Sequence, residues 1–513
     1  MTDVPDWVRD AVFYQVFPDR FASSARVAKP GALEPWDVPP TARGFKGGDL
    51  LGVLEHLDYL VDLGVNAIYL NPIFASASNH RYHTYDYMQV DPLLGGNEAL
   101  RALVDGAHAR GIRIVLDGVF NHTGRGFWPF HHVLETGAAS PYRSWFHFDQ
   151  AALDRGLPIL AYPASLERAG VALDEPHTGA QPIDRSSAAR LGYTAWWDLP
   201  ALPKLNTDDP GVRDYLFGVA EHWLRFGIDG WRLDVPAEIE DESFWHEFRR
   251  RCRAVDPEAY LVGEIWHVAP DWVRGDRFDA LMNYPLGEAI LSYAGGPRLD
   301  MDVVHGHHQY AATIAPTDAV GFGARLVDVL AAYPADVVDV QLNFIGSHDT
   351  PRARTVLGGD AAAMRLAVLL LATLPGAPCL YYGDEVGLEG GNDPASRGAF
   401  PWDRSRWDEG LHDWTRALLG LRRSEAALRR GTTRVLVTEG RAVVFERRLG
   451  DDGLIVAVNA GDQAASPLLA LDGTDRHLVR IPLPGDPGTA RVGIDPAAGL
   501  TLPPRTGGVY RVG

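Results

Sequence analysis

Acidic residues follow four of the short apolar runs in this sequence, and their spacing favours acid–base chemistry. The four segments are Asp117-Gly-Val-Phe-Asn-His122, Gly230-Trp-Arg-Leu-Asp234, Gly263-Glu-Ile-Trp266 and Gly346-Ser-His-Asp349. Arg232 lies two positions before Asp234, so the two side chains lie on the same side of a strand. Carboxylates that converge at one place repel each other, which raises the pKa of at least one of them. A protonated acid beside an ionised carboxylate is the pair that glycoside hydrolysis uses.

A metal-dependent hydrolase is an alternative interpretation of clustered carboxylates and histidines. The sequence has no His-Glu-x-x-His segment and no closely spaced histidine pair at these runs, so we prefer the glycosidase interpretation. Aromatic residues beside polar ones are a second indication, because a sugar has apolar ring faces and polar edges. They occur at Trp196-Trp197-Asp198, Ile265-Trp266-His267 and Pro401-Trp402-Asp403, although most large aromatic side chains only fill cores.

Eight apolar runs, each short enough for a buried strand, alternate with helical patterns. The predicted strands are Ala11–Phe17, Ala67–Leu70, Arg113–Val119, Gly230–Val235, Tyr260–Ile265, Phe278–Tyr284, Val338–Phe344 and Pro378–Tyr382. The predicted helices are Leu50–Leu63, Glu98–Arg110, Pro210–Phe226, Asp241–Val255 and Ala361–Leu374. This alternation predicts an α/β fold with a (β/α)8 TIM barrel, whose active site lies at the carboxyl ends of the strands.

Two stretches depart from the alternation. The connection between the third and fourth predicted strands is too long for one helix, so residues 123–205 are predicted to form an inserted subdomain. After residue 425, short strands at Val435–Val437, Ala442–Glu446, Leu454–Asn459, His477–Pro482 and Gly508–Val512 predict an all-β sandwich domain. We therefore expect a barrel in two parts, residues 1–122 and 206–425, with the inserted subdomain at 123–205 and a C-terminal β-domain at 426–513.

The charge balance of the 513 residues excludes several classes of partner. Forty-eight basic and 67 acidic residues give a formal net charge of −19, which disfavours binding to nucleic acid or to anionic membranes. Cys252 and Cys379 are too few for a disulfide framework or a cysteine-rich metal site. No signal peptide and no membrane-spanning run is recognised, so a cytoplasmic location is expected.

In their order, the four acidic segments resemble the conserved regions of the α-amylase superfamily, glycosyl hydrolase family 13, over nearly the whole chain. Leu202-Pro-Lys-Leu-Asn206 is similar to the segment that marks the neopullulanase, cyclomaltodextrinase and maltogenic amylase group. Val262–His267 and Asn392-Asp-Pro394 also resemble that group. The resemblance implies a barrel with an insertion after the third strand and a β-domain at its end.

Carried onto matching positions, the family mechanism implies three catalytic residues. Asp234 would be the nucleophile that forms a covalent glucosyl intermediate. Glu264 would donate a proton to the departing oxygen and later accept one from water, and Asp349 would bind sugar hydroxyls and stabilise the transition state. In a retaining mechanism, the carboxyl groups of Asp234 and Glu264 would be about 5–5.5 Å apart. Arg232 is expected to keep Asp234 ionised, because a nearby cation lowers a carboxyl pKa.

The resemblance also implies a set of substrate-binding residues. His122 and His348 match histidines that bind hydroxyls of the sugar at the cleavage position, and Tyr82 matches the tyrosine that stacks under that ring. Asp393 and Arg397, four residues apart after the last strand, match a pair that binds the same sugar. The set is completed by Arg232, Glu238 and Trp266.

Three departures from the group's pattern affect the prediction. The group usually carries an N-terminal β-domain that helps it to dimerise, whereas here the first predicted strand begins at Ala11. We therefore favour a monomer and leave the oligomeric state and the cyclodextrin preference open. His83 follows Tyr82 where the group usually has Asp. Glu238 stands where many α-amylases have a calcium-ligating His, so no cofactor and no metal at that position is expected; Asn121 would be structural, and calcium elsewhere is left open.

The sequence thus predicts a retaining glycoside hydrolase that cleaves α-1,4-glucosidic bonds in cyclodextrins, maltooligosaccharides, starch-type glucans or pullulan. An α-glucosidase or an α-glucan transglycosylase is an alternative, because water and a sugar hydroxyl compete for the same intermediate. A non-catalytic carbohydrate-binding relative is a third hypothesis. Such relatives typically lose a catalytic acid, whereas Asp234, Glu264 and Asp349 are all present.

Overall fold

The computed structural model describes residues 3–29, 31–157, 159–162, 186–469, 478–485, 493–494 and 499–512. Parts of two predicted domains lie outside these residues. They are residues 158 and 163–185 of the inserted subdomain, and residues 470–477, 486–492, 495–498 and 513 of the C-terminal domain, including His477, the first residue of a predicted strand.

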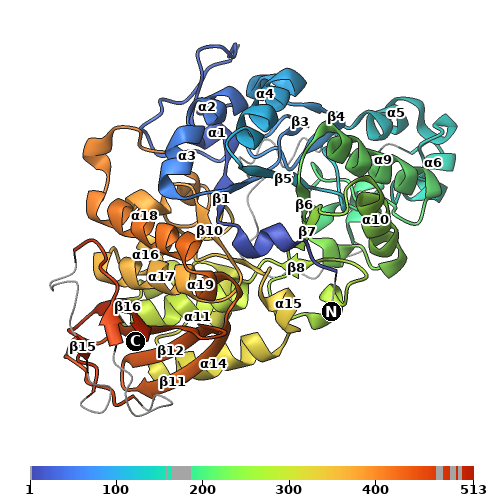
Figure 1. The fold of residues 1–513 in the computed structure, drawn as a ribbon. Coiled ribbons are helices and arrows are strands. Elements are labelled where there is room, and N and C mark those ends of the chain that lie inside the picture. Colours follow the sequence, from blue (N-terminus) through green and yellow to red (C-terminus); the bar gives the residue numbers. More distant parts are fainter. Residues whose placement is uncertain are drawn as a thin grey trace.

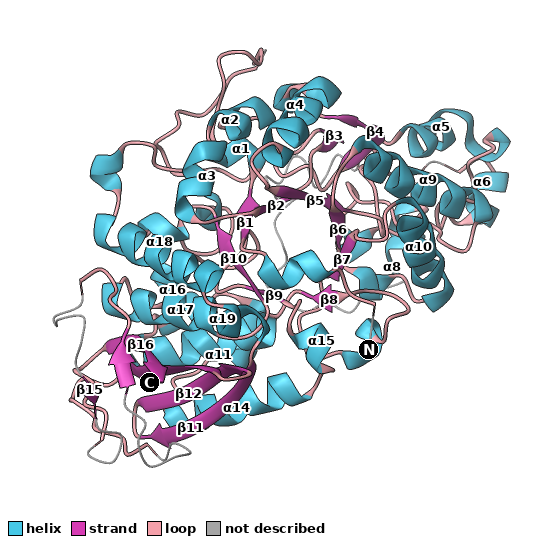
Figure 2. Cartoon of the chain, viewed as in Figure 1, coloured by secondary structure: helices cyan, strands magenta, loops and turns pink. Residues whose placement is uncertain are grey.

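Eight parallel strands form the barrel that the sequence predicts, with helices around it (Figures 1 and 2). Neighbouring strands follow the order β8-β7-β6-β5-β2-β1-β10-β9. The bounds are β1 Phe13–Val16, β2 Ala67–Leu70, β5 Arg113–Gly118, β6 Gly230–Leu233, β7 Tyr260–Gly263, β8 Ala280–Leu281, β9 Leu342–Asn343 and β10 Ala377–Tyr381. Each strand lies inside its predicted run except β10, which begins one residue earlier, because buried parallel strands are encoded by short, continuous apolar segments. The strands β8 and β9 are shorter than predicted, and Val338 of the predicted strand Val338–Phe344 belongs to a helix, α15 Ala335–Val338.

The seam between β8 and β9 closes the barrel differently from the other seams. Both strands are two residues long, and a single parallel bridge joins Met282 to Leu342. Side-chain amides supply further hydrogen bonds. Leu281 N donates to Gln341 Oε1 over 2.6 Å, and Asn283 Nδ2 donates to Asn343 Oδ1 over 2.8 Å. Polar side chains therefore take over part of the role that backbone ladders have elsewhere in the sheet.

The helices around the barrel follow the predicted apolar stripes with one clear difference. The predicted helix Leu50–Leu63 is two helices, α2 Leu50–Glu55 and α3 Leu57–Leu63. The chain turns at His56, whose Nδ1 lies 2.8 Å from Gly52 O and whose ring lies 3.8 Å from Trp402. The other long helices are α4 Gly96–His108, α9 Pro210–Phe226, α10 Glu242–Val255, α11 Tyr284–Gly295, α14 Ala319–Ala331, α17 Ala361–Thr373 and α18 Glu409–Ser424.

A short 3-10 helix, η1 Asp6–Asp10, packs against the amino-terminal end of the barrel, which we call the floor. Trp7 of η1 donates its indole N–H to Glu258 O over 2.9 Å, and its ring lies 6.0 Å from the ring of Tyr260. Inward-facing side chains of the strands, including Phe13 and Tyr69, form a separate apolar cluster above it. The barrel interior is thus a packed core, and chemistry is restricted to the opposite end.

Two segments carry side chains over the carboxyl ends of the strands, which we call the mouth. One is an antiparallel hairpin, β3 Phe74–Ser76 and β4 Thr84–Val90, which the sequence did not predict. The other is the insertion between β5 and β6, whose described part includes α5 Trp128–Thr136, α6 Gln150–Asp154, α8 Ser186–Leu191 and η4 Trp196–Asp198. An isolated antiparallel bridge between His122 and Lys204 joins the two ends of the insertion.

The C-terminal sheet has the order β11-β12-β13-β16-β14-β15 and lies beside α14 and α17 (Figure 1). Its bounds are β11 Thr432–Glu439, β12 Ala442–Leu449, β13 Asp452–Asn459, β14 Leu478–Arg480, β15 Gly493–Ile494 and β16 Thr506–Val512, preceded by α19 Ala426–Arg430. Side chains such as Phe445 join the main core, whereas Val444 on the other face packs with Leu469 and Leu502. Among the described residues, no helix is long and apolar enough to span a membrane.

Candidate active site

A single buried guanidinium organises the carboxylates at the mouth. Arg232 on β6 is 0% exposed. Its Nη1 lies 2.9 Å from Asp117 Oδ1 and 3.0 Å from Asp234 Oδ1, while its Nη2 lies 2.9 Å from Glu264 Oε1. Burial opposes the charge on Arg232, but Asp117 and Glu264 outweigh burial and hold its pKa well above the ordinary value. Three carboxylates from the ends of β5, β6 and β7 therefore share one permanent cation.

One carboxylate oxygen of Asp234 is paired with Arg232, and the other has no hydrogen-bond partner among the described residues. This second oxygen, Oδ2, is buried. Burial and the neighbouring Glu264 raise the pKa of Asp234 well above its ordinary value, and Arg232 opposes this rise. The expectation that Arg232 keeps Asp234 ionised therefore does not hold by itself: Arg232 lowers the pKa of Asp234, but burial and the neighbouring Glu264 outweigh it.

Glu264 is held in place by both of its oxygens. Val235 N donates to Oε2 over 3.0 Å, and Trp266 Nε1 donates to Oε1 over 3.2 Å. Tyr284 O–H donates to the same Oε1 over 3.4 Å, and the rings of Trp266 and Tyr284 stack 3.7 Å apart. Trp266, which the resemblance predicted as a substrate-binding residue, thus contacts the Glu264 carboxyl group, whereas Tyr284 is an additional contact that the sequence did not reveal.

His348 links the fourth acidic segment to the hairpin residue Tyr82. Its Nε2 lies 2.5 Å from Tyr82 Oη and 3.0 Å from Asp349 Oδ2, and its Nδ1 lies 2.9 Å from the amide nitrogen of Gln15. Since an amide nitrogen only donates, this network assigns the proton of the ring to Nε2. Burial, with Arg397 and Arg232, lowers the pKa of His348 well below its ordinary value, so the ring is a neutral donor.

Asp349 lies between the network of Arg232 and a second guanidinium. Arg397 Nη2 is 3.4 Å from Asp349 Oδ1, and Arg397 Nη1 is 3.1 Å from Asp393 Oδ2. Burial and Glu264 raise the pKa of Asp349 to about 7, and Arg397 opposes the rise. Its side chain is 30% exposed, so the carboxyl group remains within reach of a ligand.

An aromatic stack leads from the mouth to solvent. The ring of His122 stacks on Trp196 at 4.6 Å and 7°, and Trp196 stacks on Trp197 at 4.9 Å and 23°. Trp197 is 40% exposed and, like Asp198, has a left-handed backbone. Burial and the neighbouring His83 and Lys204 lower the pKa of His122 to about 3, and its Nε2 has no partner among the described residues.

The three aromatic segments noted in the sequence thus have different positions. Trp196 and Trp266 lie beside the predicted site residues His122 and Glu264. Trp402 packs instead against Phe21 and Phe400, with ring centroids 5.2 and 4.3 Å away, and its indole N–H donates to Phe21 O. Aromatic residues beside polar ones therefore indicated the site in two places and the core in one.

Glu238 is paired with a lysine. Lys204 Nζ donates to Glu238 O over 2.9 Å and lies 3.7 Å from Glu238 Oε2. Burial raises the pKa of Glu238, and Lys204 opposes this rise.

Asn121 Nδ2 lies 3.3 Å from His122 Nδ1. No cluster of three His, Cys, Asp or Glu side chains suited to a metal ion is found in the part of the chain that the structure describes.

Nine of the eleven predicted site residues form two contact groups, which Asp117 joins through Tyr82 and Arg232. The nine are Tyr82, Arg232, Asp234, Glu264, Trp266, His348, Asp349, Asp393 and Arg397. The other two, His122 and Glu238, both contact Lys204. The sequence did not point to Gln15, which follows no acidic segment and is recognisable only as a polar residue inside a predicted buried strand.

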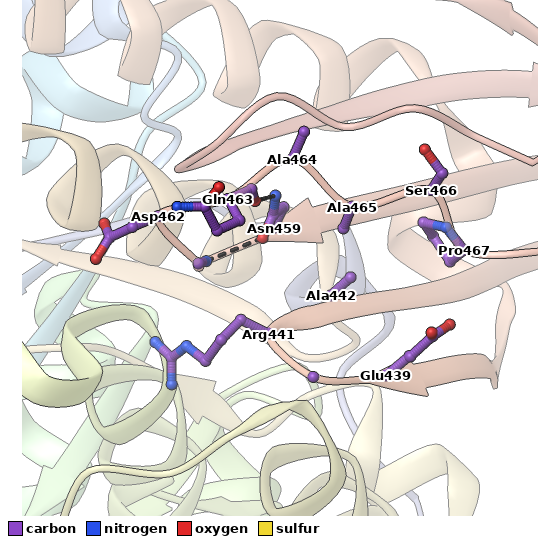
Figure 3. A pocket seen from close by; sticks show the side chains of 12 residues that line it. Glu439, Arg441, Ala442, Asn459, Asp462, Gln463, Ala464, Ala465, Ser466 and Pro467 are labelled. Atoms are coloured by element: carbon purple, nitrogen blue, oxygen red, sulfur yellow. Dashed lines mark hydrogen bonds between the residues drawn. The ribbon is translucent and has the colours of Figure 1, made fainter.

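A pocket in the C-terminal domain, shown in Figure 3, contrasts with the mouth. Its lining includes Arg441, Asn459 and Asp462, and their polar groups are already engaged. Arg441 Nη2 donates to Tyr293 O over 2.5 Å, Asn459 Oδ1 accepts from Gly461 N over 2.9 Å, and Asp462 Oδ1 lies 2.8 Å from Arg298 Nη1. No buried, unpartnered side chain of these three is directed into it.

Comparison with known proteins agrees with this geometry. The family model described as "Alpha amylase, catalytic domain" matches residues 15–419. A cyclomaltodextrinase from Geobacillus thermopakistaniensis is 41% identical over 93% of this chain and 73% of its own length. Neopullulanase 2 from Thermoactinomyces vulgaris is 38% identical over 91% of this chain and 72% of its own length.

Solved structures of nearly equal length are also similar. Ttha1563 from Thermus thermophilus has a TM-score of 0.85 at 45% identity, covering 98% of this chain and 99% of that one. The debranching enzyme from Nostoc punctiforme has a TM-score of 0.83 at 42% identity, covering 100% of both chains. Cyclic α-maltosyl-(1→6)-maltose hydrolase from Arthrobacter globiformis has a TM-score of 0.82 at 35% identity, covering 99% and 100%. The chain therefore belongs to the α-amylase family and is a glycosidase of that family.

Proposed function

We propose that this glycosidase cleaves α-glucosidic bonds by a retaining mechanism with Asp234 as nucleophile and Glu264 as acid and base. The observation that carries the proposal is that the two terminal nitrogens of Arg232 bind Asp234 and Glu264, with Asp234 Oδ2 left open. In such chemistry one carboxyl group is protonated and the other is not. A proton on Glu264 removes one cause of the raised pKa of Asp234, and Arg232 then favours the ionised nucleophile.

In the first step Glu264 gives its proton to the glycosidic oxygen as the bond from that oxygen to the anomeric carbon breaks. Asp234 Oδ2 forms a covalent bond to the same carbon. In the second step Glu264, now a carboxylate, accepts a proton from water, whose oxygen displaces Asp234. In this proposal Asp349 and the neutral His348 bind hydroxyls of the sugar, and the Nε2–H of His348, which lies near Tyr82 Oη and Asp349 Oδ2, turns to the sugar when it binds.

We propose small α-glucans, including molecules with α-1,6 branches, as the substrates. The support is the similarity to two solved structures. One is a debranching enzyme with a TM-score of 0.83 at 42% identity, and the other is a cyclic α-maltosyl-(1→6)-maltose hydrolase with a TM-score of 0.82 at 35% identity. Exposed Trp197, at the outer end of the aromatic stack, offers an apolar face to a further sugar ring.

Product analysis over time tests the substrate and the competing activities together. Maltotriose, β-cyclodextrin, pullulan and an α-1,6-branched maltooligosaccharide are incubated in parallel with the purified enzyme. Hydrolysis predicts only products shorter than the input. Accumulation of longer oligosaccharides would instead establish a transglycosylase. Activity only at non-reducing ends would establish an α-glucosidase, and no turnover of any glucan would contradict the proposal.

We also propose that no calcium ion binds at the carbonyl oxygen of Glu238. Lys204 Nζ donates to Glu238 O, so an ammonium group occupies the carbonyl oxygen where the family resemblance places a calcium ligand in other members. Treatment with EDTA followed by desalting is expected to leave kcat/KM and Tm unchanged. A loss of either that added Ca²⁺ restores would contradict this expectation.

A further inference from the structure

The loop that carries Asp393 and Arg397 is held from two sides. On the side of the mouth, Arg397 Nε donates to His348 O over 2.9 Å and Nη2 lies 3.4 Å from Asp349 Oδ1. On the inner side the contacts come from Arg352, a residue with no place in the mechanism above. The position of Arg397 relative to Asp349 thus depends on both sides.

Arg352 lies three residues after Asp349, between that segment and the loop. Its backbone N–H donates to Gly390 O over 3.0 Å, and its Nε donates to Ser396 O over 2.7 Å. Gly390 and Ser396 lie on either side of Asp393, and Ser396 directly precedes Arg397. One residue therefore fixes the loop at both ends.

The other contacts of Arg352 anchor it to the barrel. Its Nη1 donates to Tyr382 O, just after β10, and lies 3.2 Å from Asp384 Oδ1. The guanidinium carbon lies 3.9 and 4.5 Å from the ring centroids of Tyr381 and Tyr382. The side chain is fully buried, so water does not compete for these contacts. A planar, multidentate donor suits this role, whereas a lysine offers only a point charge.

We propose that Arg352 is a positioning residue for catalysis, which sets the distance between Arg397 and Asp349 by fixing the 390–397 loop to the end of β10. The proposal rests on the roles proposed above for Asp349 and Arg397. Arg352 touches no substrate and acts only through Arg397. Errors of about 1 Å in the placement of such groups lower rates by as much as 10²-fold, so the effect is measurable.

A double-mutant cycle with R352K and R397A tests this dependence. R352K keeps the charge beside Asp384 but loses the fork that binds Ser396 O and Tyr382 O. We expect kcat/KM to fall about ten-fold in R352K and about 10²-fold in R397A. Because Arg352 acts through Arg397, adding R352K to R397A should change kcat/KM by less than about three-fold. A larger further loss in the double mutant would overturn the proposal.

The pH profile gives a readout that a purely structural role would not move. Arg397 lowers the pKa of Asp349, so a displaced Arg397 raises it. The acid limb of the kcat/KM profile should therefore shift to higher pH in R352K. An unchanged limb together with a reduced kcat/KM would also overturn the proposal.

Arg422 offers a matched control at the other end of the same strand. It is as buried as Arg352, and its guanidinium donates to Ala372 O and Leu374 O, each over 3.0 Å, and to Gly376 O, just before β10. R422K removes a comparable buried fork far from Asp349. We expect R422K to lower Tm without changing kcat/KM by more than about two-fold or moving the acid limb. A loss in R422K equal to that in R352K would overturn the proposal, because any buried arginine bound next to an end of β10 would then have this effect.

Two outcomes separate this proposal from the proposed function. If R397A keeps wild-type activity, the roles of Arg397 and Arg352 both fail, whereas loss of activity in D234N still supports the catalytic assignment. If R397A is impaired but the double mutant is additive, only the role of Arg352 fails. Should R352K fail to fold, R352M/D384N replaces it in the cycle, because that pair leaves no unpaired buried charge.

Discussion

The two ends of the barrel contain the same kinds of charged residues in opposite proportions. At the mouth Arg232 serves three carboxylates within 3.0 Å, and one oxygen of Asp234 has no partner among the described residues. At the floor Asp279 alone receives Arg249 at 2.7 Å, Arg253 at 2.6 Å and the N–H of Leu261 at 2.8 Å. Cations are scarce at one end and abundant at the other.

A second floor carboxylate follows the same rule. Asp229 receives Arg113 Nη1 at 2.6 Å, His108 Nε2 at 2.7 Å and the N–H of Ile114 at 2.8 Å. A buried carboxylate with all of its acceptors filled contributes to folding. Asp117 and Asp234, which share Arg232, have raised pKa values, and a carboxyl group with a raised pKa is prepared for proton transfer. The ratio of cations to carboxylates therefore distinguishes the stabilising end of this barrel from the reactive end.

The largest expected effect comes from removing a charge at the mouth. D234N and E264Q should each lower kcat by about 10⁴-fold, because nucleophile and proton donor act as a unit. Since each substitution removes a repelling charge, Tm should stay constant or rise. Kinetics and calorimetry on the purified variants measure both. Near-normal activity in either variant would contradict the catalytic assignment. It would also contradict the distinction between a reactive mouth and a stabilising floor.

The converse substitution at the floor should affect folding alone. D279N leaves Arg249 and Arg253 without a counter-charge at Asp279, which costs about 3–5 kcal/mol of unfolding free energy. Urea unfolding measures this loss, and kcat of the folded fraction should match the wild type. A drop in kcat at unchanged stability would show that the floor takes part in catalysis.

A smaller effect is expected where the mouth extends into solvent. W197A removes the exposed ring of the aromatic stack, and the loss of one ring–sugar contact of about 1 kcal/mol corresponds to roughly five-fold in kcat/KM. The loss should be confined to substrates long enough to reach Trp197, so maltose and maltohexaose are compared. The exposed Trp128, outside the stack, serves as the control W128A. Equal losses of kcat/KM on maltose and maltohexaose would contradict the proposal that Trp197 binds a further sugar ring.

The last effect concerns the pH dependence of stability. The pKa of Asp349 is about 7 in the folded protein, above the value of about 3.9 for an unfolded chain. Between about pH 4 and pH 7 the folded protein therefore keeps a proton on Asp349 that the unfolded chain has released. The contribution of Asp349 to the free energy of unfolding is fully present below about pH 4 and is lost as the pH rises towards 7. D349N, which does not titrate, should raise Tm at pH 8 relative to wild type and have no such effect at pH 4. A lower Tm of D349N than of the wild type at pH 8 would show that Asp349 stabilises the fold, as the floor carboxylates do.

The barrel and its acidic segments were predictable because both depend on local patterns. Runs such as Ala67–Leu70 are apolar throughout, and the residue that ends each run is carried to the mouth by the fold itself. Asp234, Glu264 and Asp349 could thus be grouped before any contact was known. The inserted subdomain and the β-domain followed from breaks in the same alternation.

The features that the sequence did not predict depend on contacts between distant segments. Gln15 reaches His348 across 333 positions of the sequence, and no local pattern records that pairing. The hairpin β3–β4 has a register irregularity at Ala75 that weakens its alternation. Helix Leu50–Leu63 is interrupted because the ring of His56 packs against Trp402, which is far away in the sequence. Tertiary contacts thus overrode local preference at these points.

The seam between β8 and β9 has a consequence for how the fold tolerates change. Seven seams of the barrel are joined by main-chain ladders, which every residue type supplies, so mutation seldom removes them. The eighth combines one main-chain bridge and the bond from Asn283 N to Leu342 O with the amide side chains of Gln341, Asn283 and Asn343. A single substitution at one of these three positions removes a hydrogen bond between β8 and β9, so this seam is more sensitive to mutation than the other seven.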